Sequence, residues 1–358
     1  FELSLKMNEE PEAASENEVL SKKTPHDIIA EFGYHFDERQ LRKIKDGSGF
    51  TFTTQKDYED LGDAIGEAIY DMMEKECGLV RMPCLTERNK YYGFVFTSPE
   101  YEMKETVLVL IHGSGVVKAG QWARKLIINE NLDRGTQLPY IKRALANDWG
   151  VVVLNYNEKC DRTRDDVKHQ CSPSLHGVAQ FNLALSGDAP LFVVAHSFGG
   201  SIISDVMRRD ESWRRRIRAV CLTDSWFNVP SYNCAANWCT SKQRLRKDSQ
   251  VYQLYAGDDT HEGTSSAAIN SIFHLLESHP TSRNFRKLLL ECEEIVQKEK
   301  EEREKVKAEK PKQEEEKKTN GKEGNTQKSD FSDEDQPVEE TEISDSVGRD
   351  PDEKEDCK

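Results

Sequence analysis

The sequence predicts an α/β fold of the hydrolase type, with a mostly parallel sheet covered by helices on both faces. Short apolar strands alternate with helical segments from residue 79 onward, which is the pattern of a parallel sheet enclosed between helices. One of these strands runs into the turn around Ser197, and an earlier strand runs into a loop that begins His112-Gly113. Both junctions are typical of hydrolase active sites, which lie at the ends of strands.

Composition divides the 358 residues into one large domain with extensions. Residues 1–23 are polar and acidic, so we expect a disordered lead-in. The hydrolase-type domain is expected over residues 24–285, followed by a charged helix over 286–311 and a disordered acidic tail over 312–358. Phe331 is the only aromatic residue of that tail, so the tail lacks the apolar surface that folding requires.

The domain is expected to open with a hairpin followed by a helix. A turn signal at residues 46–49 separates short apolar runs, which predict strands at Phe32–Phe36, Leu41–Ile44 and Phe50–Phe52. Apolar residues then recur at helical spacing, which predicts an amphipathic helix whose buried face holds Leu61, Ile65, Ile69 and Met72.

The main sheet and its helices follow from hydrophobic periodicity. The predicted strands are Gly93–Phe96, Thr106–Ile111, Val151–Leu154, Leu191–Ala195, Ala219–Thr223 and Val251–Tyr255. The predicted helices are Leu138–Ala146, His176–Leu185, Gly200–Met207 and Ala267–Leu276. The polar segment Asn157–Pro173 is rich in turn-forming residues, so it is expected to be an exposed loop.

The segment Leu191–Gly200 predicts a nucleophile elbow. Its sequence A-H-S-F-G around Ser197 is a variant of G-x-S-x-G, in which a sharp turn between strand and helix lifts the serine hydroxyl above the sheet. The small residues Ala195 and Gly199, two positions before and after Ser197, allow the turn to pack against neighbouring strands. Ser197 is therefore the expected nucleophile; the alternative is that it only caps the following helix.

The loop after the strand at 106–111 predicts an oxyanion hole. It reads H-G-S-G, and in hydrolases such a loop bends back towards the elbow. Its amide N–H groups then join the amide that follows the nucleophile, so the expected donors are Gly113, Ser114 and Phe198. A phosphate-cradling loop is the alternative, although the segment lacks the Lys and the spacing of a P-loop.

A serine nucleophile requires an acid and then a histidine later in the chain. Asp224 directly follows the strand at 219–223, and His261 follows the strand at 251–255 across a short loop. Both side chains should therefore emerge at the sheet edge that holds Ser197. In that arrangement His261 takes the Ser197 proton, while Asp224 orients the imidazole.

Alternatives remain open at this point. Asp258 and Asp259 are rival acids, although they lie close enough to His261 in sequence to serve only its loop. His261 itself has the alternative of an exposed loop histidine. His196 is expected to pack or hydrogen-bond rather than to act as a base, and His176 is expected to be a helix residue.

Composition argues against several other classes of protein. The nine cysteines include no C-x-x-C pair, so we predict no metal site, no cofactor and no disulfide framework, and a reducing compartment suits them. No apolar run approaches the roughly 18 residues of a membrane span. The net charge of −15 argues against direct nucleic-acid binding. An arginine cluster at residues 208–218 has two readings, contact with RNA or an acidic partner, or pairing with neighbouring acids.

The two ends of the chain bear on its location in the cell. The final E-D-C-K does not match an endoplasmic-reticulum retention tetrapeptide, so residence in the reticulum is not expected. Because the sequence begins at Phe1, a targeting signal upstream of it would not be seen.

The segment VLIHGSGVVKAGQWARKLIINE at residues 109–130 is long and distinctive. Further motifs are FVVAHS at 192–197, LTDS at 222–225 and AGD with HE within 256–262. Over about residues 24–277 the chain thereby resembles the Argonaute-binding protein two (Arb-two) domain family, and within it the animal cotranscriptional regulators.

The resemblance implies an α/β-hydrolase fold with Ser197 at the family's nucleophile position. It also implies a nuclear and cytoplasmic partner of Argonaute and chromatin proteins, acting in RNA silencing and alternative-splicing control. The chain departs from the subfamily at residues 157–176, which are shorter and more polar than its long basic insert. It departs again at the C-terminus, where a retention-like tetrapeptide is missing.

Two functions therefore remain, because a fold does not fix a function. The first expectation is a hydrolase-fold adaptor for Argonaute and chromatin proteins with residual serine hydrolase activity. The alternative is an active hydrolase that cleaves an ester, thioester or amide of a small acyl substrate through Ser197, Asp224 and His261.

Overall fold

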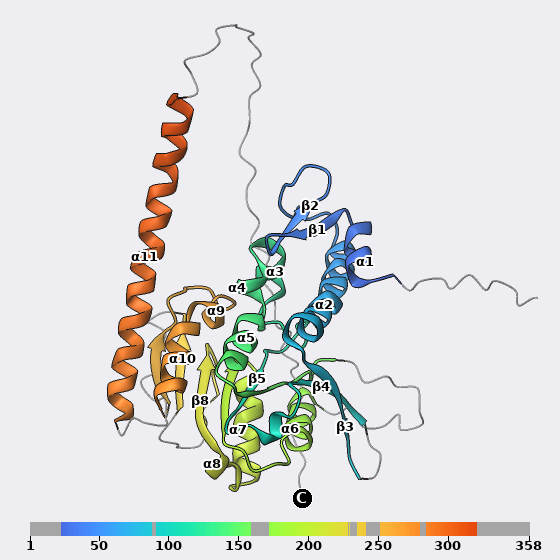
Figure 1. The fold of residues 1–358 in the computed structure, drawn as a ribbon, viewed down its shortest axis with the longest axis vertical. Helices are drawn as coiled ribbons and strands as arrows, with labels where there is room; N and C mark the ends of the chain where they lie inside the picture. The colour runs from blue at the N-terminus through green and yellow to red at the C-terminus, as the bar shows by residue number, and fades with distance from the viewer. Residues whose placement is uncertain are drawn as a thin grey trace, which may run out of the picture. The chain divides into compact units, whose positions relative to one another are not determined.

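An eight-stranded sheet forms the centre of the fold, in the order β10-β9-β8-β7-β5-β6-β4-β3 (Figure 1). Its strands are β3 (Val80–Leu85), β4 (Tyr91–Thr97), β5 (Val107–Ile111), β6 (Gly150–Val153), β7 (Leu191–His196), β8 (Ile217–Thr223), β9 (Ala235–Cys239) and β10 (Tyr252–Tyr255). Only β4 runs antiparallel to its neighbours, and the other adjacent pairs are parallel. This confirms the predicted α/β-hydrolase-like fold. The computed structural model describes residues 23–87, 91–158, 172–227, 229, 235–240, 251–279 and 284–320.

Helices enclose the sheet on both sides and build two buried cores. The first core lies beneath α2 (Gln55–Cys77), α3 (Arg124–Asn129), α4 (Leu132–Gly135), α5 (Leu138–Ala146), α10 (Ile269–Ser278) and the start of α11 (Phe285–Asn320). The second lies beneath α6 (Pro173–Ala184), α7 (Gly199–Arg209) and α8 (Trp213–Arg216). Leu108 and Leu110 of β5 enter the first core, while Val109 and Ile111 enter the second, because successive side chains of a strand point to opposite faces.

The N-terminal hairpin and helix are confirmed, with two corrections. The hairpin pairs β1 (Tyr34–Asp37) with β2 (Gln40–Lys43), and α2 buries the four apolar residues predicted to form its inner face. The third strand predicted at residues 50–52 is wrong, because Phe50 instead packs its ring against those of Tyr34 and Tyr58. The helix α1 (Pro25–Glu31) was not predicted, although Thr24 and Asp27 form a capping box at its start.

The sequence did not predict two strands of the main sheet. β3 is an edge strand with exposed residues at both ends and Pro83 in its middle, and proline within a run argues against a strand. β9 is fully buried, but its sequence A-A-N-W-C has neither alternation nor β-branched residues. Its position between β8 and β10 therefore comes from packing rather than from local propensity.

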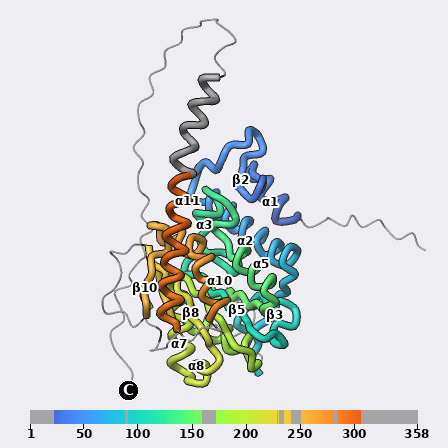
Figure 2. Tube along the Cα trace, turned by 60° about the vertical axis from the view of Figure 1, so that its left-hand side comes forward, coloured from blue at the N-terminus to red at the C-terminus, as the bar shows by residue number. Residues whose placement is uncertain are grey.

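The helix α11 is both longer and more integrated than the predicted charged segment. Its first turns lie beside α10 (Figure 2) and bury Leu289, Cys292 and Val296 in the first core. Ser271 of α10 donates to the Cys292 carbonyl at 3.0 Å. The compact unit that holds the sheet ends at Glu304. The helix continues to Asn320, past the expected end at residue 311. Residues 1–22, 159–171 and 321–358 lie outside the described part of the chain, and the predictions for the lead-in, most of the loop after Asn157 and most of the tail fall there.

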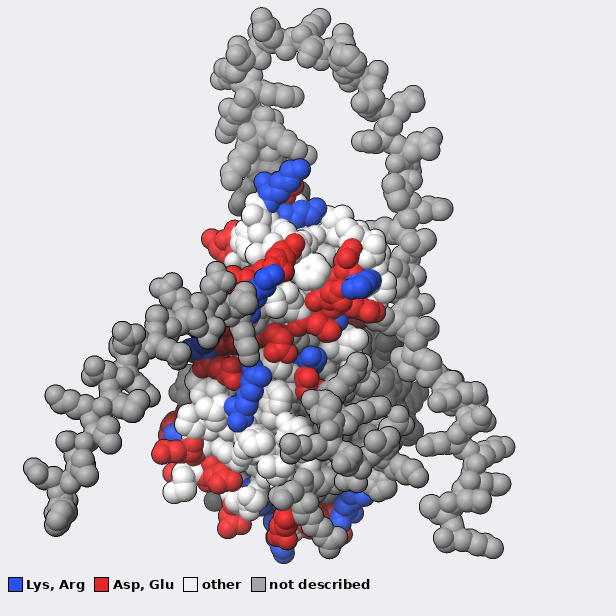
Figure 3. Space-filling model, turned by 90° about the vertical axis from the view of Figure 1, so that its right-hand side faces the viewer, with Lys and Arg blue, Asp and Glu red and all other residues white. Residues whose placement is uncertain are grey.

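Acidic and basic side chains are interspersed on the face of the molecule seen in Figure 3. Along α2, carboxylates are paired with cations in Lys56–Asp60, Arg124–Asp63, Lys118–Glu67, Lys75–Asp71 and Arg81–Glu74. Arg124 is buried, but the other pairs are exposed or partly exposed, and such pairs stabilise a fold by only about 0–1 kcal/mol each. The cores rather than the surface charges therefore hold the domain together. Within the described residues, no helix is long and apolar enough to cross a membrane.

Candidate active site

The carboxyl end of β5 is the point where the chain reverses its direction across the sheet. From β5 the chain passes to β6 on one side, and from β6 it crosses to β7 on the other side. Ligands of open α/β sheets bind at such topological switch points. The loop that starts at His112 and the turn at Ser197 leave the sheet side by side at this point.

Ser197 lies on a strained turn, as the elbow motif predicts. Its φ of 50° is in the left-handed region, which residues other than glycine adopt only under constraint from their surroundings. The Ser197 N–H donates to the Thr223 carbonyl at 2.9 Å, and the Ser225 hydroxyl donates to the Ser197 carbonyl at 2.8 Å. Phe198, not Ser197, is the residue that caps α7, which argues against the capping alternative.

The two glycines after Ser197 allow this close approach. A Cβ at Gly199 would lie 2.7 Å from the His112 carbonyl oxygen and 2.8 Å from that of Ile111. A Cβ at Gly200 would lie 2.1 Å from the Ser225 hydroxyl. Gly199 is therefore required by close approach of the backbone at Ile111 and His112, and Gly200 by the Ser225 side chain, rather than by backbone dihedral angles.

Gly199→Ala should destabilise the domain, because the backbone of β5 cannot move away cheaply. Overpacking of this kind costs about 3 kcal/mol, which for a domain of this size lowers Tm by about 6 °C or more. Gly187→Ala is the matched control, since a Cβ there has its nearest neighbour at 3.8 Å, and its Tm should change by less than about 2 °C. Equal Tm values for the two variants would contradict the described packing of the elbow.

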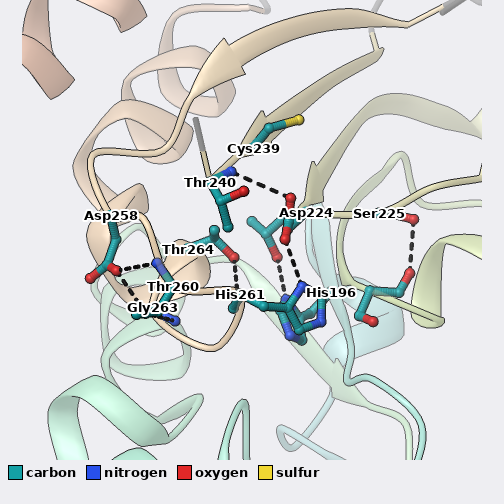
Figure 4. Close-up of polar contacts among 12 residues, drawn as sticks. His196, Asp224, Ser225, Cys239, Thr240, Asp258, Thr260, His261, Gly263 and Thr264 are labelled. Atoms are coloured by element: carbon teal, nitrogen blue, oxygen red, sulfur yellow. Dashed lines mark hydrogen bonds and ion pairs between the residues drawn. The ribbon is translucent and has the colours of Figure 1, made fainter. Parts of the chain in front are cut away.

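Asp224 and His261 form a hydrogen-bonded pair at the same edge of the sheet (Figure 4). His261 Nδ1 lies 2.6 Å from Asp224 Oδ2, and the Thr240 N–H donates to Asp224 Oδ1 at 3.3 Å. Burial opposes ionisation of Asp224, but hydrogen bonds and charge from His261, aided by Thr240, outweigh it and lower the pKa of the carboxyl. With Nδ1–H facing the carboxylate, His261 Nε2 is left without a proton and can act as a base.

The rival acids take no part in this pair. Asp258 accepts from Arg134 Nη2 at 2.6 Å and from the Thr260 N–H and hydroxyl at 2.8 and 2.7 Å, so it fixes the loop that carries His261. Asp259 is exposed. The structure thus favours Asp224 as the partner of His261.

Two further histidines lie next to the elbow but are held neutral. Burial lowers the pKa of His112 to about 4. Burial, reinforced by neighbouring His261, lowers the pKa of His196 to about 3. His196 Nδ1 lies 3.1 Å from the Thr223 hydroxyl and 3.3 Å from that of Ser265, and its ring centroid is 4.7 Å from that of His261 (Figure 4). These contacts agree with the packing or hydrogen-bonding role predicted for His196. His176 lies in a helix, α6, as predicted, and its Nε2 is 2.8 Å from the Tyr92 carbonyl oxygen.

The two neutral histidines should make the domain sensitive to acid. Their unfolded-state pKa is about 6.5, so on acidification below that value the unfolded chain takes up two protons that the folded chain does not. The free energy of unfolding is therefore highest above about pH 6.5 and decreases as pH falls towards 4. The decrease should be about 3 kcal/mol between pH 7.5 and 5.5. Urea unfolding at these two pH values measures the loss.

His196→Gln should halve this loss of stability, because only one buried histidine then remains. His35→Gln, at an exposed site in β1, should leave the loss unchanged. A stability that is the same at pH 7.5 and 5.5 in the wild-type protein would contradict the assignment of both imidazoles as neutral.

The structure brings the predicted site residues to one edge of the sheet. Ser197 follows β7 and bonds the backbone of the residue just before Asp224, which follows β8 and holds His261. A Cβ at Gly113 would lie 3.4 Å from Ser197 Cβ, so the loop after β5 also reaches the elbow. Among the described contacts, no hydrogen bond joins the Ser197 hydroxyl to His261; such contacts are often long before substrate binds.

Three of the six arginines in the cluster make local contacts. Arg208 lies 3.8 Å from Asp205, and Arg214 lies 3.2 Å from Glu211. Arg216 donates to the carbonyls of Leu185 and Ala189. These contacts favour the local-pairing interpretation of the cluster. In the described residues, no group of three or more His, Cys, Asp or Glu side chains could hold a metal ion.

Comparison with known proteins places the chain in a family. The Arb2 domain matches residues 25–173. A Caenorhabditis elegans protein, FAM172 family protein homolog Y75B8A.31, is 39% identical over 298 residues, covering 75% of this chain and 93% of its own. The human cotranscriptional regulator ARB2A is 33% identical over 346 residues, covering 72% of this chain and 82% of its own. The chain belongs to the ARB2A/FAM172 family.

The Arb2 match covers the N-terminal extension and the sheet as far as β6, so it includes the H-G-S-G loop but ends before Ser197. Among solved structures, similarity extends to an α/β serine hydrolase without a lid, XC6422 from Xanthomonas campestris. That protein is 12% identical with a TM-score of 0.33, over 56% of this chain and 92% of its own. The family of the chain is given by its homology to the ARB2A regulators, and its fold is given by the strand order of the sheet.

Proposed function

We propose that this chain is a cotranscriptional regulator that acts as an adaptor between Argonaute-type and chromatin proteins in the nucleus, with a cytoplasmic pool. Similarity over most of its length to a protein named cotranscriptional regulator ARB2A carries this proposal. The sheet, with one buried core packed on each of its faces, supplies a scaffold. On such a scaffold the loops and helices at the surface are free to diverge for partner binding.

Co-purification tests the adaptor role. The full-length tagged chain, expressed in animal cells, should retain Argonaute and chromatin proteins after nuclease treatment, because the proposed contacts are between proteins. Retention that disappears on nuclease treatment, or no retention above that of an unrelated α/β hydrolase, would contradict the proposal.

We further propose that the site retains serine acyl-hydrolase chemistry. The observation that favours it is the 2.6 Å contact between His261 and Asp224, next to a serine held at a φ of 50°. Neither feature is required for a hydrolase fold to act only as a scaffold. A strained serine and a paired histidine are instead the elements of a nucleophile and its base.

The proposed reaction proceeds in two steps. His261 Nε2 removes the Ser197 proton as Oγ attacks the acyl carbonyl, and the tetrahedral oxyanion is held by the N–H groups of Phe198 and of the loop at Gly113 and Ser114. Collapse breaks the bond to the leaving alcohol, thiol or amine, which takes the proton from His261. Water, deprotonated by His261, then attacks the acyl carbonyl. The bond between the acyl carbon and Ser197 Oγ breaks, His261 returns the proton to Oγ, and the carboxylate leaves. Asp224 stabilises the imidazolium in both steps.

Labelling with a fluorophosphonate probe tests the chemistry. The wild-type protein should be modified at Ser197, as located by peptide mass spectrometry, and should hydrolyse p-nitrophenyl acetate. Modification at another residue, or none at concentrations that label an ordinary esterase, would contradict the hydrolase proposal and leave the adaptor proposal standing.

A further inference from the structure

The loop after β5 is anchored by Tyr156 and Asn157, which lie three and four residues after the end of β6. The Tyr156 hydroxyl donates to the His112 carbonyl at 2.8 Å, and the Tyr156 ring stacks on the His112 imidazole at 4.4 Å. Asn157 Nδ2 donates to the carbonyls of Gly113 and Val117 at 3.0 and 2.9 Å. One side chain thereby ties Gly113, within the H-G-S-G segment, to Val117, two residues after it.

These bonds also fix the direction of two amide groups. The carbonyl of His112 shares a peptide plane with the N–H of Gly113, and the carbonyl of Gly113 shares one with the N–H of Ser114. In a trans peptide the two groups point in opposite directions, and the described chain contains no cis peptide bond. Holding the two carbonyls towards the β6 side therefore turns both N–H groups away from it.

The opposite side is where Ser197 lies. β5 sits between β6 and β7 in the sheet, and Ser197 directly follows β7. A Cβ at Gly113 would be 3.4 Å from Ser197 Cβ. In the described part of the chain, neither the Gly113 nor the Ser114 N–H donates to a backbone carbonyl, so both remain available to a ligand at the serine.

We propose that Tyr156 and Asn157 are positioning residues that set the oxyanion hole. The inference rests on the proposed hydrolase reaction. Without these donors, the His112 carbonyl loses its hydrogen bond and the Gly113 carbonyl keeps only its 2.8 Å contact with His112 Nδ1. Rotation of either peptide would present a carbonyl dipole to the developing negative charge and destabilise the transition state. Because oxyanion stabilisation acts on the transition state rather than on bound substrate, the effect is on kcat and not on KM.

Three variants test the proposal with p-nitrophenyl acetate as substrate. Tyr156→Phe removes one hydroxyl but keeps the ring stacked on His112. Asn157→Leu removes both hydrogen bonds donated by the side-chain amide and replaces it with a side chain of similar size. Tyr101→Phe is the control, since its buried hydroxyl also donates to a backbone carbonyl, that of Ala184 at 2.6 Å, away from the site. Loss of an oxyanion donor itself lowers kcat about 10²–10³-fold, so we expect smaller losses of about 10-fold for Tyr156→Phe and 30-fold for Asn157→Leu.

The KM of all three variants should stay within about twofold of the wild-type value. The kcat of Tyr101→Phe should also stay within about twofold of wild type. Phenylboronic acid, which forms a tetrahedral anion on the serine, should bind the two site variants more weakly, by the same factor by which their kcat falls.

If the wild-type protein is labelled at Ser197 but both site variants match Tyr101→Phe in kcat, the positioning role is wrong and the hydrolase proposal stands. If the wild-type protein is not labelled, both proposals fail. Tm measured for each variant separates these outcomes from loss of fold.

Discussion

Asp224→Asn should lower kcat for ester hydrolysis by about 10⁴-fold while the fold remains intact. The carboxylate accepts the Nδ1–H of His261 at 2.6 Å, which leaves Nε2 as the base. An amide in its place can donate to Nδ1 and so favours the tautomer that carries its proton on Nε2. That tautomer cannot accept the Ser197 proton. Steady-state kinetics with p-nitrophenyl acetate measure the loss.

Asp258→Asn is the matched control for this prediction. Asp258 lies three residues before His261 and accepts from Arg134 and Thr260, so the substitution changes a nearby carboxylate without touching the imidazole. Its kcat should remain within about threefold of wild type, even if the loop loses some stability. A larger loss of kcat for Asp258→Asn than for Asp224→Asn would show that the acid has been misassigned.

The main features of the fold could be predicted because the buried strands of a parallel sheet are apolar throughout. β5, β6 and β7 are buried at every position, so each appears in the sequence as a short, mostly apolar run. The helix α5 begins and ends at the predicted residues, Leu138 and Ala146. Prediction failed where local sequence and tertiary position disagree, as in β9, which is buried but has no β-branched residues and no alternation.

The candidate site could be predicted as far as chain order allows. A serine after one strand, an acid after the next and a histidine after a later strand converge because the carboxyl ends of parallel strands lie at one edge. The contribution of Tyr156 and Asn157 could not be predicted in this way. It depends on β6 lying beside β5 on the side away from β7, and strand order is a long-range property that periodicity does not contain.

The pairing of Asp224 rather than Asp258 with His261 also required the structure. Both carboxylates are close to the histidine, one in sequence and one in space. Arg134 and Thr260 occupy Asp258, and Arg134 is 124 positions away from it in the chain. Which acid pairs with the histidine therefore depends on contacts between residues that are far apart in sequence, and these are known only from the folded structure.

Ser197→Ala separates the two activities proposed for the chain. It removes one hydroxyl and keeps a small side chain, so the turn and its contacts with Thr223 and Ser225 should persist. Without the nucleophile, fluorophosphonate labelling should disappear and kcat should fall by about 10⁶-fold, the loss seen when a catalytic serine is removed. The adaptor role requires the surface of the domain rather than this hydroxyl.

Argonaute co-purification with the Ser197→Ala protein tests the proposed regulator most directly. Wild-type and variant chains are expressed at equal levels in animal cells, with Tm measured on purified protein to show that the fold is unchanged. We expect Argonaute recovery within about twofold of wild type, a change of under roughly 0.5 kcal/mol in binding free energy, alongside complete loss of labelling. A tenfold fall in Argonaute recovery with a normally folded Ser197→Ala protein would contradict the adaptor role and make acyl transfer the basis of its function.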